Sequence, residues 1–252
     1  MTVVKSRKIR LDRLLVEEGL TSSRERAQAM ILAGQVLVNE QKIEKCGTVV
    51  SASAQLRLLR EPLKYVGRAG IKLEGALDHF GVDARGKVCM DVGSSTGGFT
   101  DCLLQRGATK VFAVDVGTHQ LDWKLRSDPR VTVLEKTNAR YLRFEQIGAK
   151  VELSTMDVSF ISATLILPAL PPLLEAGADL LVLVKPQFEL GRGQVGKGGI
   201  VRDARLHEEA ISKVARKLAE LGFAGIGRAE SVLPGAEGNR EFFLHAIWPK
   251  NI

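Results

Sequence analysis

Four charged side chains stand where a protein core would not choose them. Lys72 follows the Gly-rich stretch GRAGI, Asp157 and Lys185 end apolar runs in STMDVSF and LVLVKPQF, and Glu241 precedes the apolar run of GNREFFLH. An unpaired charge in apolar surroundings is unfavourable, so these residues indicate either salt-bridge partners or a reaction site. Two amines and two carboxylates are suited to activating a hydroxyl that attacks an electrophile.

A Gly- and Ser-rich turn, VCMDVGSSTGGFTD, joins an apolar strand to a helix. Gly93, Gly97 and Gly98 leave room for a ligand to approach the backbone at the carboxyl end of that strand. A dinucleotide site favours GxGxxG, but Ser95 replaces the second glycine, and no GK[ST] phosphate loop is present. Asp91, before the turn, suits a cationic ligand group better than a pyrophosphate.

Two further polar residues extend this candidate site. Asp115 ends the second strand in VFAVDVG, where an acid accepts hydrogen bonds from ribose hydroxyls, and Asn138 in EKTNAR is suited to read an adenine edge. Together with Asp91 they indicate S-adenosylmethionine; the alternative is a tight strand-to-helix connection that binds nothing. The predicted cofactor-binding residues are Asp91, Gly93, Ser94, Ser95, Thr96, Gly97, Gly98, Phe99, Asp115, Val116, Asn138, Ala139 and Asp157.

The elements that must position these residues alternate between strands and helices. Apolar runs predict strands at 88–92, 111–116, 131–134, 151–156, 180–184 and 242–248, and helical spacing predicts helices at 99–106, 120–126, 165–175 and 206–221. This alternation predicts an α/β fold with a parallel, doubly wound sheet and helices on both faces. Asp157, Lys185 and the glycine turn then share the carboxyl edge where such sheets bind ligands.

The N-terminal segment has a different character. The chain has 252 residues, enough for a large and a small domain, and residues 1–60 carry eleven Lys or Arg against six Asp or Glu, an excess of five out of the net +7. Helical spacing from Leu11 to Leu15, a capping-box pattern at Ser22 and Glu25, and short apolar strands follow. The basic excess is typical of a nucleic-acid-binding module, although a solvated face is the alternative. Glu61-Pro62 suggests a linker, giving predicted domains at 1–61 and 62–252.

The stretch IRLDRLLVEEGLTSSRERAQAMILAGQVLVN resembles the S-four-type RNA-binding domain, a small α+β module. The resemblance implies docking onto structured RNA. A Gly-rich connection, ELGRGQVGKGGIVRD, is predicted to be a flap that grips RNA phosphates, or else a long surface connection. The predicted RNA-binding residues are Arg7, Lys8, Arg10, Arg24, Arg26, Arg68, Arg192 and Lys197.

Five stretches, GRAGIKL, DVGSSTGGFTD, MDVSFIS, LVKPQFE and GNREFF, resemble the TlyA family of bacterial ribosomal RNA 2′-O-methyltransferases, whose catalytic domain is FtsJ-like. The resemblance implies a Rossmann-like class I methyltransferase domain, S-adenosylmethionine as cofactor, a cytidine ribose as target, and ribosomal RNA or ribosomal subunits as partners. It places the family's Lys-Asp-Lys-Glu tetrad on Lys72, Asp157, Lys185 and Glu241. Gly67-Arg68 departs from the Ser-Arg that is common in the family, on the side that would face RNA.

The residue types fit this chemistry. A ribose 2′-hydroxyl is a poor nucleophile, so its proton must be removed or its developing oxyanion stabilised. Burial and a second nearby lysine both disfavour an ammonium, so Lys185 beside Lys72 is a candidate base. Our hypothesis is Lys185 as base and Lys72 as oxyanion stabiliser, with Asp157 and Glu241 orienting the amines; the reverse assignment stays open.

Other readings are less well supported by the sequence. Base-amino methylation typically uses Asn/Asp-Pro-Pro-aromatic, whereas the chain has DVSF after the fourth strand; carbon-5 methylation needs a crevice Cys, but Cys89 lies inside a strand and Cys102 on a helix. The His residues are dispersed, so no metal is expected. Without a signal or membrane-spanning stretch, a soluble cytoplasmic protein is expected. A membrane-active haemolysin and a non-catalytic RNA-binding protein remain the alternatives.

Overall fold

The computed structural model describes residues 7–21, 23–59, 64–191, 193–235 and 238–249. Contacts divide the chain into two compact units, Met1–Leu63 and Lys64–Ile252, which are described separately. The proposed linker at Glu61-Pro62 lies outside the described residues. None of the helices in the described ranges combines the length and apolarity needed to cross a bilayer.

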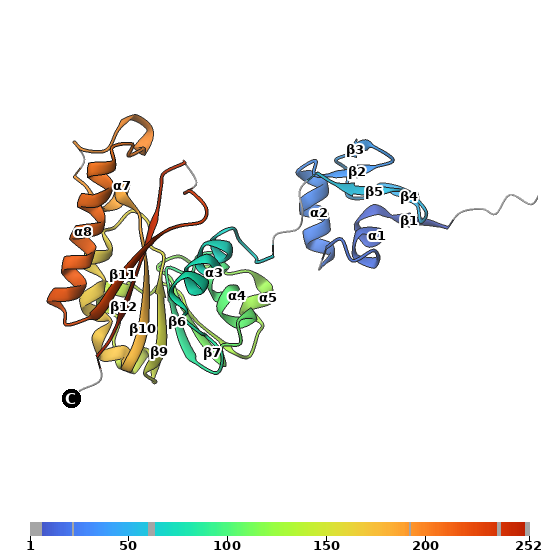
Figure 1. Cartoon of the computed structure of the whole chain (residues 1–252). Helices are drawn as coiled ribbons and strands as arrows, with labels where there is room; N and C mark the ends of the chain where they lie inside the picture. Colours follow the sequence, from blue (N-terminus) through green and yellow to red (C-terminus); the bar gives the residue numbers. More distant parts are fainter. Residues whose placement is uncertain (1–6, 22, 60–63, 192, 236–237, 250–252) are drawn as a thin grey trace, which may run out of the picture. The chain divides into compact units, whose positions relative to one another are not determined.

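A seven-stranded sheet lies at the centre of the larger unit (Figure 1). Its strand order is β11 (Ala224–Glu230), β12 (Phe242–Ile247), β10 (Leu174–Val184), β9 (Val151–Met156), β6 (Val88–Val92), β7 (Lys110–Val114) and β8 (Val131–Leu134). The five strands from β10 to β8 are parallel, and β6 neighbours both β7 and β9. The chain therefore reverses its direction of winding between β6 and β9, which is where this fold opens a crevice. The predicted α/β class is confirmed.

Helices cover both faces of this sheet (Figure 1). On one face lie α3 (Ala69–Phe80), α4 (Gly98–Gln105) and α5 (Trp123–Arg126), and on the other lies α8 (Ala204–Glu220). Because side chains alternate along a strand, Leu181 and Leu183 of β10 pack in the cluster under α3 and α4, whereas Leu180 and Val182 pack in the cluster under α8. A strand buried on both faces is apolar at every position, which explains why the sequence shows continuous apolar runs.

The sequence pattern predicted a parallel sheet, whereas the sheet in the structure is mixed. Strand β12 is antiparallel to β10 and to β11. The sequence analysis missed β11, whose sequence AGIGRAE has two glycines and little apolar alternation. Strand β11 follows α8 and lies at the edge of the sheet. The chain then turns back, so β12 lies between β11 and β10 and runs antiparallel to both.

Two predicted helices differ from the structure. The helix predicted at 165–175 is wrong: three 3₁₀ turns, η2 (Ala163–Leu165), η3 (Leu167–Ala169) and η4 (Pro171–Leu173), lead directly into β10. Pro168, Pro171 and Pro172 lack the amide hydrogen that an α-helix needs, so only single turns form. The helix predicted at 120–126 is shorter, because Asp122 caps α5 by accepting a hydrogen bond from the Lys124 amide.

The smaller unit contains two helices and two small sheets. Strand β1 (Lys8–Arg10) pairs with β4 (Val49–Ser51), and β2 (Val36–Val38) lies between β3 (Gln41–Ile43) and β5 (Leu56–Leu58). Helices α1 (Leu11–Glu17) and α2 (Arg24–Leu32) pack Leu11, Leu15 and Ile31 into its core. Ser23 caps α2 by accepting from the Arg26 amide at 3.2 Å, whereas the predicted cap Ser22 lies outside the described residues.

Candidate active site and RNA-facing surface

A pocket of about 480 Å³ opens at the carboxyl edge of the parallel strands. It is formed by the loops that follow β6, β7, β8 and β9, so four consecutive strands contribute to it. Among the predicted cofactor residues, the pocket is lined by Gly93, Ser95, Asp115, Val116, Asn138, Ala139 and Asp157. The crevice predicted from the strand pattern is therefore a real cavity of ligand size.

The turn after β6 depends on glycine at its first position. Gly93 has a φ of +86°, and a Cβ there would lie 2.2 Å from the main-chain oxygen of Asp157. The loops after β6 and β9 thus approach as closely as their backbones allow. Ser94, Gly97, Gly98 and Phe99 are buried, and Thr96 is exposed. Unlike Gly93 and Ser95, these five predicted residues are not among the described residues that line the pocket.

Asp115 holds this turn in place. Its carboxylate accepts hydrogen bonds from the amides of Ser95 and Gly117, both at 2.7 Å. Each carboxylate oxygen can accept a second hydrogen bond, so the group is also able to bind a pair of hydroxyls in the pocket. Asn138 caps the turn η1 (Ala139–Tyr141), where its side-chain oxygen accepts from the Arg140 amide at 3.1 Å.

Asp91 lies in β6, directly before the glycine turn. Its side chain is fully buried within β6 and accepts hydrogen bonds from Thr100 at 2.7 Å and Thr155 at 3.3 Å. Burial raises the pKa of the Asp91 carboxyl to about 7, and the negative charge of Asp157 acts in the same direction. Asp91 is not among the described pocket-lining residues, so its predicted direct contact with the cofactor stays a prediction.

The four charged residues singled out in the sequence form two ion pairs. Lys72 on α3 donates to Glu241 at 2.6 Å, and their side chains are only 11% and 4% exposed. Lys185 lies 2.6 Å from Asp157, with 13% and 17% exposed, and donates to the Ser159 hydroxyl at 2.9 Å. Each lysine in these two pairs has a carboxylate partner, which offsets part of the cost of burying its charge.

Sheet topology brings the two pairs together. Val184 of β10 is registered with Phe242 of β12, so Lys185, one residue later, and Glu241, one residue earlier, leave the same end of the ladder. Asp157 follows β9, which neighbours β10 on its other side. The order across this edge is therefore Asp157, Lys185, Glu241 and then Lys72, which reaches Glu241 from α3.

Several functional candidates were missed by sequence reasoning. The pocket is also lined by Gln120, Thr137, Arg140, Val158, Ser159, Phe160, Ile161 and Ile166. Phe160 has a φ of +64° and is 92% exposed, while its ring lies 5.2 Å from that of Phe188. The available signal was position alone, because residues directly after a parallel strand lie at the ligand edge.

Another buried carboxylate, that of Glu189, connects two active-site segments. Glu189, in α7 (Pro186–Glu189), accepts from the Ala163 amide at 2.7 Å and from the Ser162 hydroxyl, and Lys213 lies 3.5 Å away. The segment that carries Lys185 therefore contacts the loop after β9 at both ends, through Lys185 and through Glu189.

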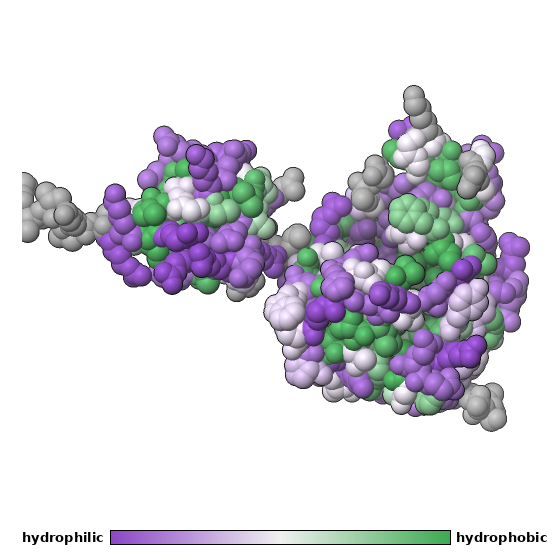
Figure 2. Space-filling view, turned by 180° about the vertical axis from the view of Figure 1, so that it is seen from behind, coloured by the Kyte–Doolittle hydropathy of each residue, from purple (hydrophilic) through white to green (hydrophobic). Residues whose placement is uncertain are grey.

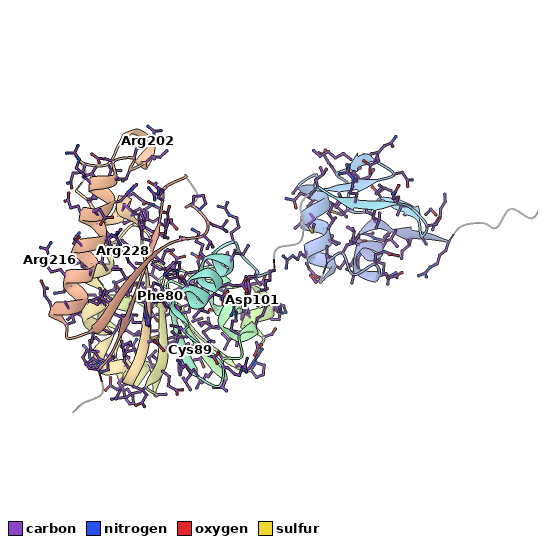
Figure 3. All side chains as sticks on the ribbon, in the orientation of Figure 1. Phe80, Cys89, Asp101, Arg202, Arg216 and Arg228 are labelled. Atoms are coloured by element: carbon purple, nitrogen blue, oxygen red, sulfur yellow. The ribbon has the colours of Figure 1, made fainter. Side chains whose placement is uncertain are left out.

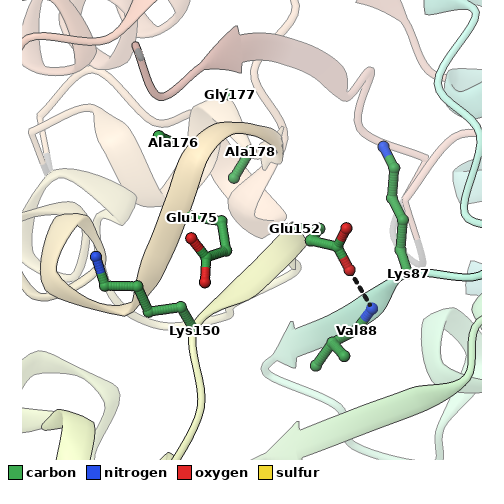
Figure 4. A pocket seen from close by; sticks show the side chains of 8 residues that line it. All are labelled: Lys87, Val88, Lys150, Glu152, Glu175, Ala176, Gly177 and Ala178. Atoms are coloured by element: carbon green, nitrogen blue, oxygen red, sulfur yellow. Dashed lines mark hydrogen bonds between the residues drawn. The ribbon is translucent and has the colours of Figure 1, made fainter. Parts of the chain in front are cut away.

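The larger unit has another pocket, of about 490 Å³, at the opposite edge of the sheet (Figure 4). Lys87, Lys150, Glu152 and Glu175 line it, and Glu152 accepts a hydrogen bond from the Val88 amide at 3.0 Å. It lies at the starts of β6 and β9, away from the strand-end loops that hold ligands in this architecture. Within the described ranges, no cluster of His, Cys, Asp or Glu is suited to hold a metal ion.

The predicted RNA-binding residues differ in their exposure and in their ion-pair partners. Lys8 and Arg68 are exposed, and Arg7 lies 3.6 Å from Glu17. Arg10 and Arg24 both contact Asp12, at 2.9 Å. Arg192 and the side chain of Lys197 lie outside the described residues, so the flap stays a prediction.

Comparison with known families decides what this architecture is. Residues 65–247 match the model of the FtsJ-like methyltransferase, and residues 9–56 match that of the S4 domain. The chain belongs to the FtsJ-like methyltransferase family. As in the resemblance stated above, an S4 domain precedes the S-adenosylmethionine-dependent catalytic fold, and the protein is a methyltransferase.

Individual relatives of this FtsJ-like protein match it over most of its length. The 16S/23S rRNA (cytidine-2′-O)-methyltransferase TlyA of Mycobacterium tuberculosis is 47% identical over 95% of this chain and 90% of its own. Hemolysin A of Brachyspira hyodysenteriae is 43% identical over 95% of this chain and 100% of its own. A solved structure from Streptococcus thermophilus, provisionally named a hemolysin, superposes with a TM-score of 0.74 at 42% identity, covering 97% of this chain and 90% of the other.

Proposed function

We propose that the protein transfers a methyl group from S-adenosylmethionine to the 2′-hydroxyl of a cytidine ribose in ribosomal RNA. The observation that carries the proposal is the pair of Lys–carboxylate contacts at the strand edge, where Asp157 and Ser159 both contact Lys185 and line the pocket. The relative from Mycobacterium tuberculosis carries this activity in its name at 47% identity. A ribosomal RNA substrate would place the reaction in the cytoplasm.

The pocket fits S-adenosylmethionine by its chemistry. Asp115 offers carboxylate oxygens for the ribose hydroxyls, and the glycine turn exposes backbone at Gly93. Asn138 and Ala139 follow β8, the strand beyond β7 in the sheet order, and line the same cavity, where they would contact an adenine. When bound, S-adenosylmethionine supplies an electrophilic methyl group on a sulfonium centre. Its sulfonium end would then lie toward Asp157, beside Lys185.

The two lysines have different surroundings, which supports different roles. The partners of Lys185 line the pocket, whereas Lys72 contacts Glu241, which is not among the described lining residues. We therefore assign Lys185 as the base that accepts the 2′-hydroxyl proton and Lys72 as the group that stabilises the developing oxyanion. Asp157 and Glu241 orient the two amines. Correct placement of the attacking oxygen supplies a further, large part of the rate enhancement.

The structure gives little support to methylation at base carbon 5. Such chemistry needs a thiolate, and burial raises the pKa of both Cys89 and Cys102 to about 12. Cys89 lies on β6 within the sheet, and Asp101 marks the adjoining α4 (Figure 3). Neither thiol is placed to attack a base in the pocket.

The test is methyl transfer to purified 30S and 50S ribosomal subunits with labelled S-adenosylmethionine. We expect label in a nucleotide whose 3′-phosphodiester bond resists alkaline cleavage, because 2′-O-methylation removes the attacking hydroxyl. Label on a base, or no transfer together with lysis of erythrocytes by the purified protein, would favour a base methyltransferase or a haemolysin respectively. Binding of ribosomal RNA without transfer would indicate a non-catalytic RNA-binding protein.

A further inference from the structure

Asp12 of the S4 domain is a fully buried carboxylate whose arginine partners are partly exposed. It lies on α1 with 0% of its side chain exposed, although the side chains around it are basic. Three side chains donate to it: Arg10 through Nε at 3.0 Å and Nη2 at 2.9 Å, Arg24 through Nε at 2.9 Å, and Gln28 through Nε2 at 2.8 Å. The carboxylate is thus enclosed by donors from β1 and α2.

These contacts keep Asp12 ionised. The hydrogen bonds from Arg10, Gln28 and Arg24 hold the pKa of Asp12 well below its usual range, against the opposing effect of burial. A buried charge that is paired on all sides is expensive to disturb, because removing one partner leaves another unsatisfied. The positions of Arg10 and Arg24 are therefore fixed relative to each other.

Both arginines keep donors for another ligand. Their side chains are 42% and 48% exposed. Arg10 donates to Asp12 through Nε and Nη2, and Arg24 donates through Nε alone. The Nη1 of Arg10 and both Nη atoms of Arg24 make no hydrogen bond with the other described residues. The guanidinium fork matches the spacing of phosphate oxygens. Lys8 and Arg13 nearby in sequence are exposed as well, and hydrophilic side chains cover much of the visible face of this unit in Figure 2.

We propose that Asp12 is a positioning residue that holds Arg10 and Arg24 as a preformed clamp for the phosphate backbone of RNA. This inference rests on the proposed function, since it assumes that the S4 domain docks the enzyme on ribosomal RNA. Asp12 itself contacts no phosphate. It acts by removing the rotamer freedom that two long side chains would otherwise lose on binding.

The proposal predicts an effect opposite in sign to simple electrostatics. The substitution Asp12→Asn removes a negative charge from a basic surface, so charge alone predicts tighter RNA binding. If Asp12 positions the arginines, the same substitution weakens binding, because an amide accepts fewer and weaker hydrogen bonds and Arg10 loses its two-point partner. A matched control is Glu17→Gln, which makes the same charge change on the same helix and touches Arg7 instead.

The experiment measures binding of the full-length protein to purified 30S and 50S subunits at about 50 and 200 mM salt. We expect Asp12→Asn to bind about tenfold more weakly, with a shallower salt dependence, and Glu17→Gln to bind at least as tightly as the wild type. In the Arg10→Ala/Arg24→Ala background, adding Asp12→Asn should cause no further loss, since Asp12 acts only through those arginines. The affinity for S-adenosylmethionine, measured in parallel, should be unchanged.

Each other outcome counts against the proposal. Equal or tighter binding by Asp12→Asn would show that charge, and not position, governs the contact. An equal further loss in the double-arginine background would show that Asp12 acts by maintaining the domain fold. A wild-type protein that binds neither subunit would overturn the proposed function along with this inference, whereas wild-type binding and methyl transfer with an unaffected Asp12→Asn would overturn this inference alone.

Discussion

Lys185 and Glu241 leave the same end of the antiparallel β10–β12 ladder, each one residue beyond its last registered pair. The backbone thus places the amine of Lys185 beside the carboxylate of Glu241. That carboxylate accepts a hydrogen bond from a different amine, that of Lys72. Lys185 in turn contacts Asp157 at the end of the neighbouring strand. Amines and carboxylates therefore alternate along one sheet edge, in the order Asp157, Lys185, Glu241 and Lys72.

Asp115 should be the main polar determinant of cofactor affinity. The Asp115 carboxylate accepts hydrogen bonds from two backbone amides and lines the pocket. The substitution Asp115→Asn keeps the shape of the side chain but removes its negative charge. We expect the Kd for S-adenosylmethionine to rise about tenfold or more, as measured by calorimetry. The matched control is Asp83→Asn, because Asp83 also accepts the amide two residues later but is exposed and distant from the pocket lining. Equal effects of the two substitutions would refute the assignment.

Gly93 should be required by the approach of two loops. In Gly93→Ala the new Cβ would meet the carbonyl oxygen of Asp157, whereas in Gly81→Ala, which has a similar φ of +66°, nothing lies within 4 Å. Both variants pay the conformational penalty of a left-handed alanine. Only Gly93→Ala should weaken binding of S-adenosylmethionine, by about tenfold or more, because overpacking shifts the pocket walls. A parallel loss in Gly81→Ala would attribute the effect to backbone strain alone.

Glu189 should couple the loop after β9 to Lys185. In Glu189→Gln the bonds to Ala163 and Ser162 lose their charged acceptor, and Lys213 loses its ion pair but keeps its hydrogen bond to the main-chain oxygen of residue 189. We expect kcat to fall about tenfold while the KM for RNA stays the same, since the S4 contacts are untouched. Glu209→Gln is the control, because Glu209 is exposed and contacts Gln194. An effect confined to the KM for RNA would contradict this coupling.

Asp91 should make stability pH-dependent. Its pKa is raised in the folded protein to about 7 from an ordinary value of 3.8, so the folded state binds the extra proton and stability falls as pH rises between these values. Asp91→Asn removes that dependence. The melting temperature of the variant relative to the wild type should therefore increase from pH 5 to pH 8, in ligand-free protein. A difference that is constant with pH, or that shrinks, would contradict the raised pKa.

The sequence was sufficient for the elements whose pattern is local. Leu180 to Val184 are apolar at every position because that strand is buried on both faces. Pro171 and Pro172 carried a signal against the helix predicted at 165–175 that apolar spacing outweighed. Strand β11 was missed because it contains two glycines and none of its residues is buried, so it has no apolar period.

The candidate site was predictable in its members but not in its contacts. The types and settings of Lys72 and Glu241 were visible, yet their hydrogen bond joins residues 169 positions apart and depends on packing of α3 against the sheet. The same limit applies to Asp12, whose arginine partners looked like free RNA contacts. Asp91 precedes the glycine turn, and its burial could not be foreseen from that position; its contact with the cofactor stays a prediction.

The most direct test of the central claim is methyl transfer by Lys185→Ala to ribosomal subunits, with mass-spectrometric mapping of the methylated nucleoside. The account predicts 2′-O-methylcytidine with wild-type protein and a rate lower by about 10²–10⁴ with Lys185→Ala, as expected for loss of a general base. The Kd for S-adenosylmethionine should stay close to wild type, and the control Lys217→Ala, at a half-buried lysine of α8 that pairs with Glu220, should be fully active. Wild-type transfer by Lys185→Ala, or a methyl group on the base instead of the ribose, would contradict it.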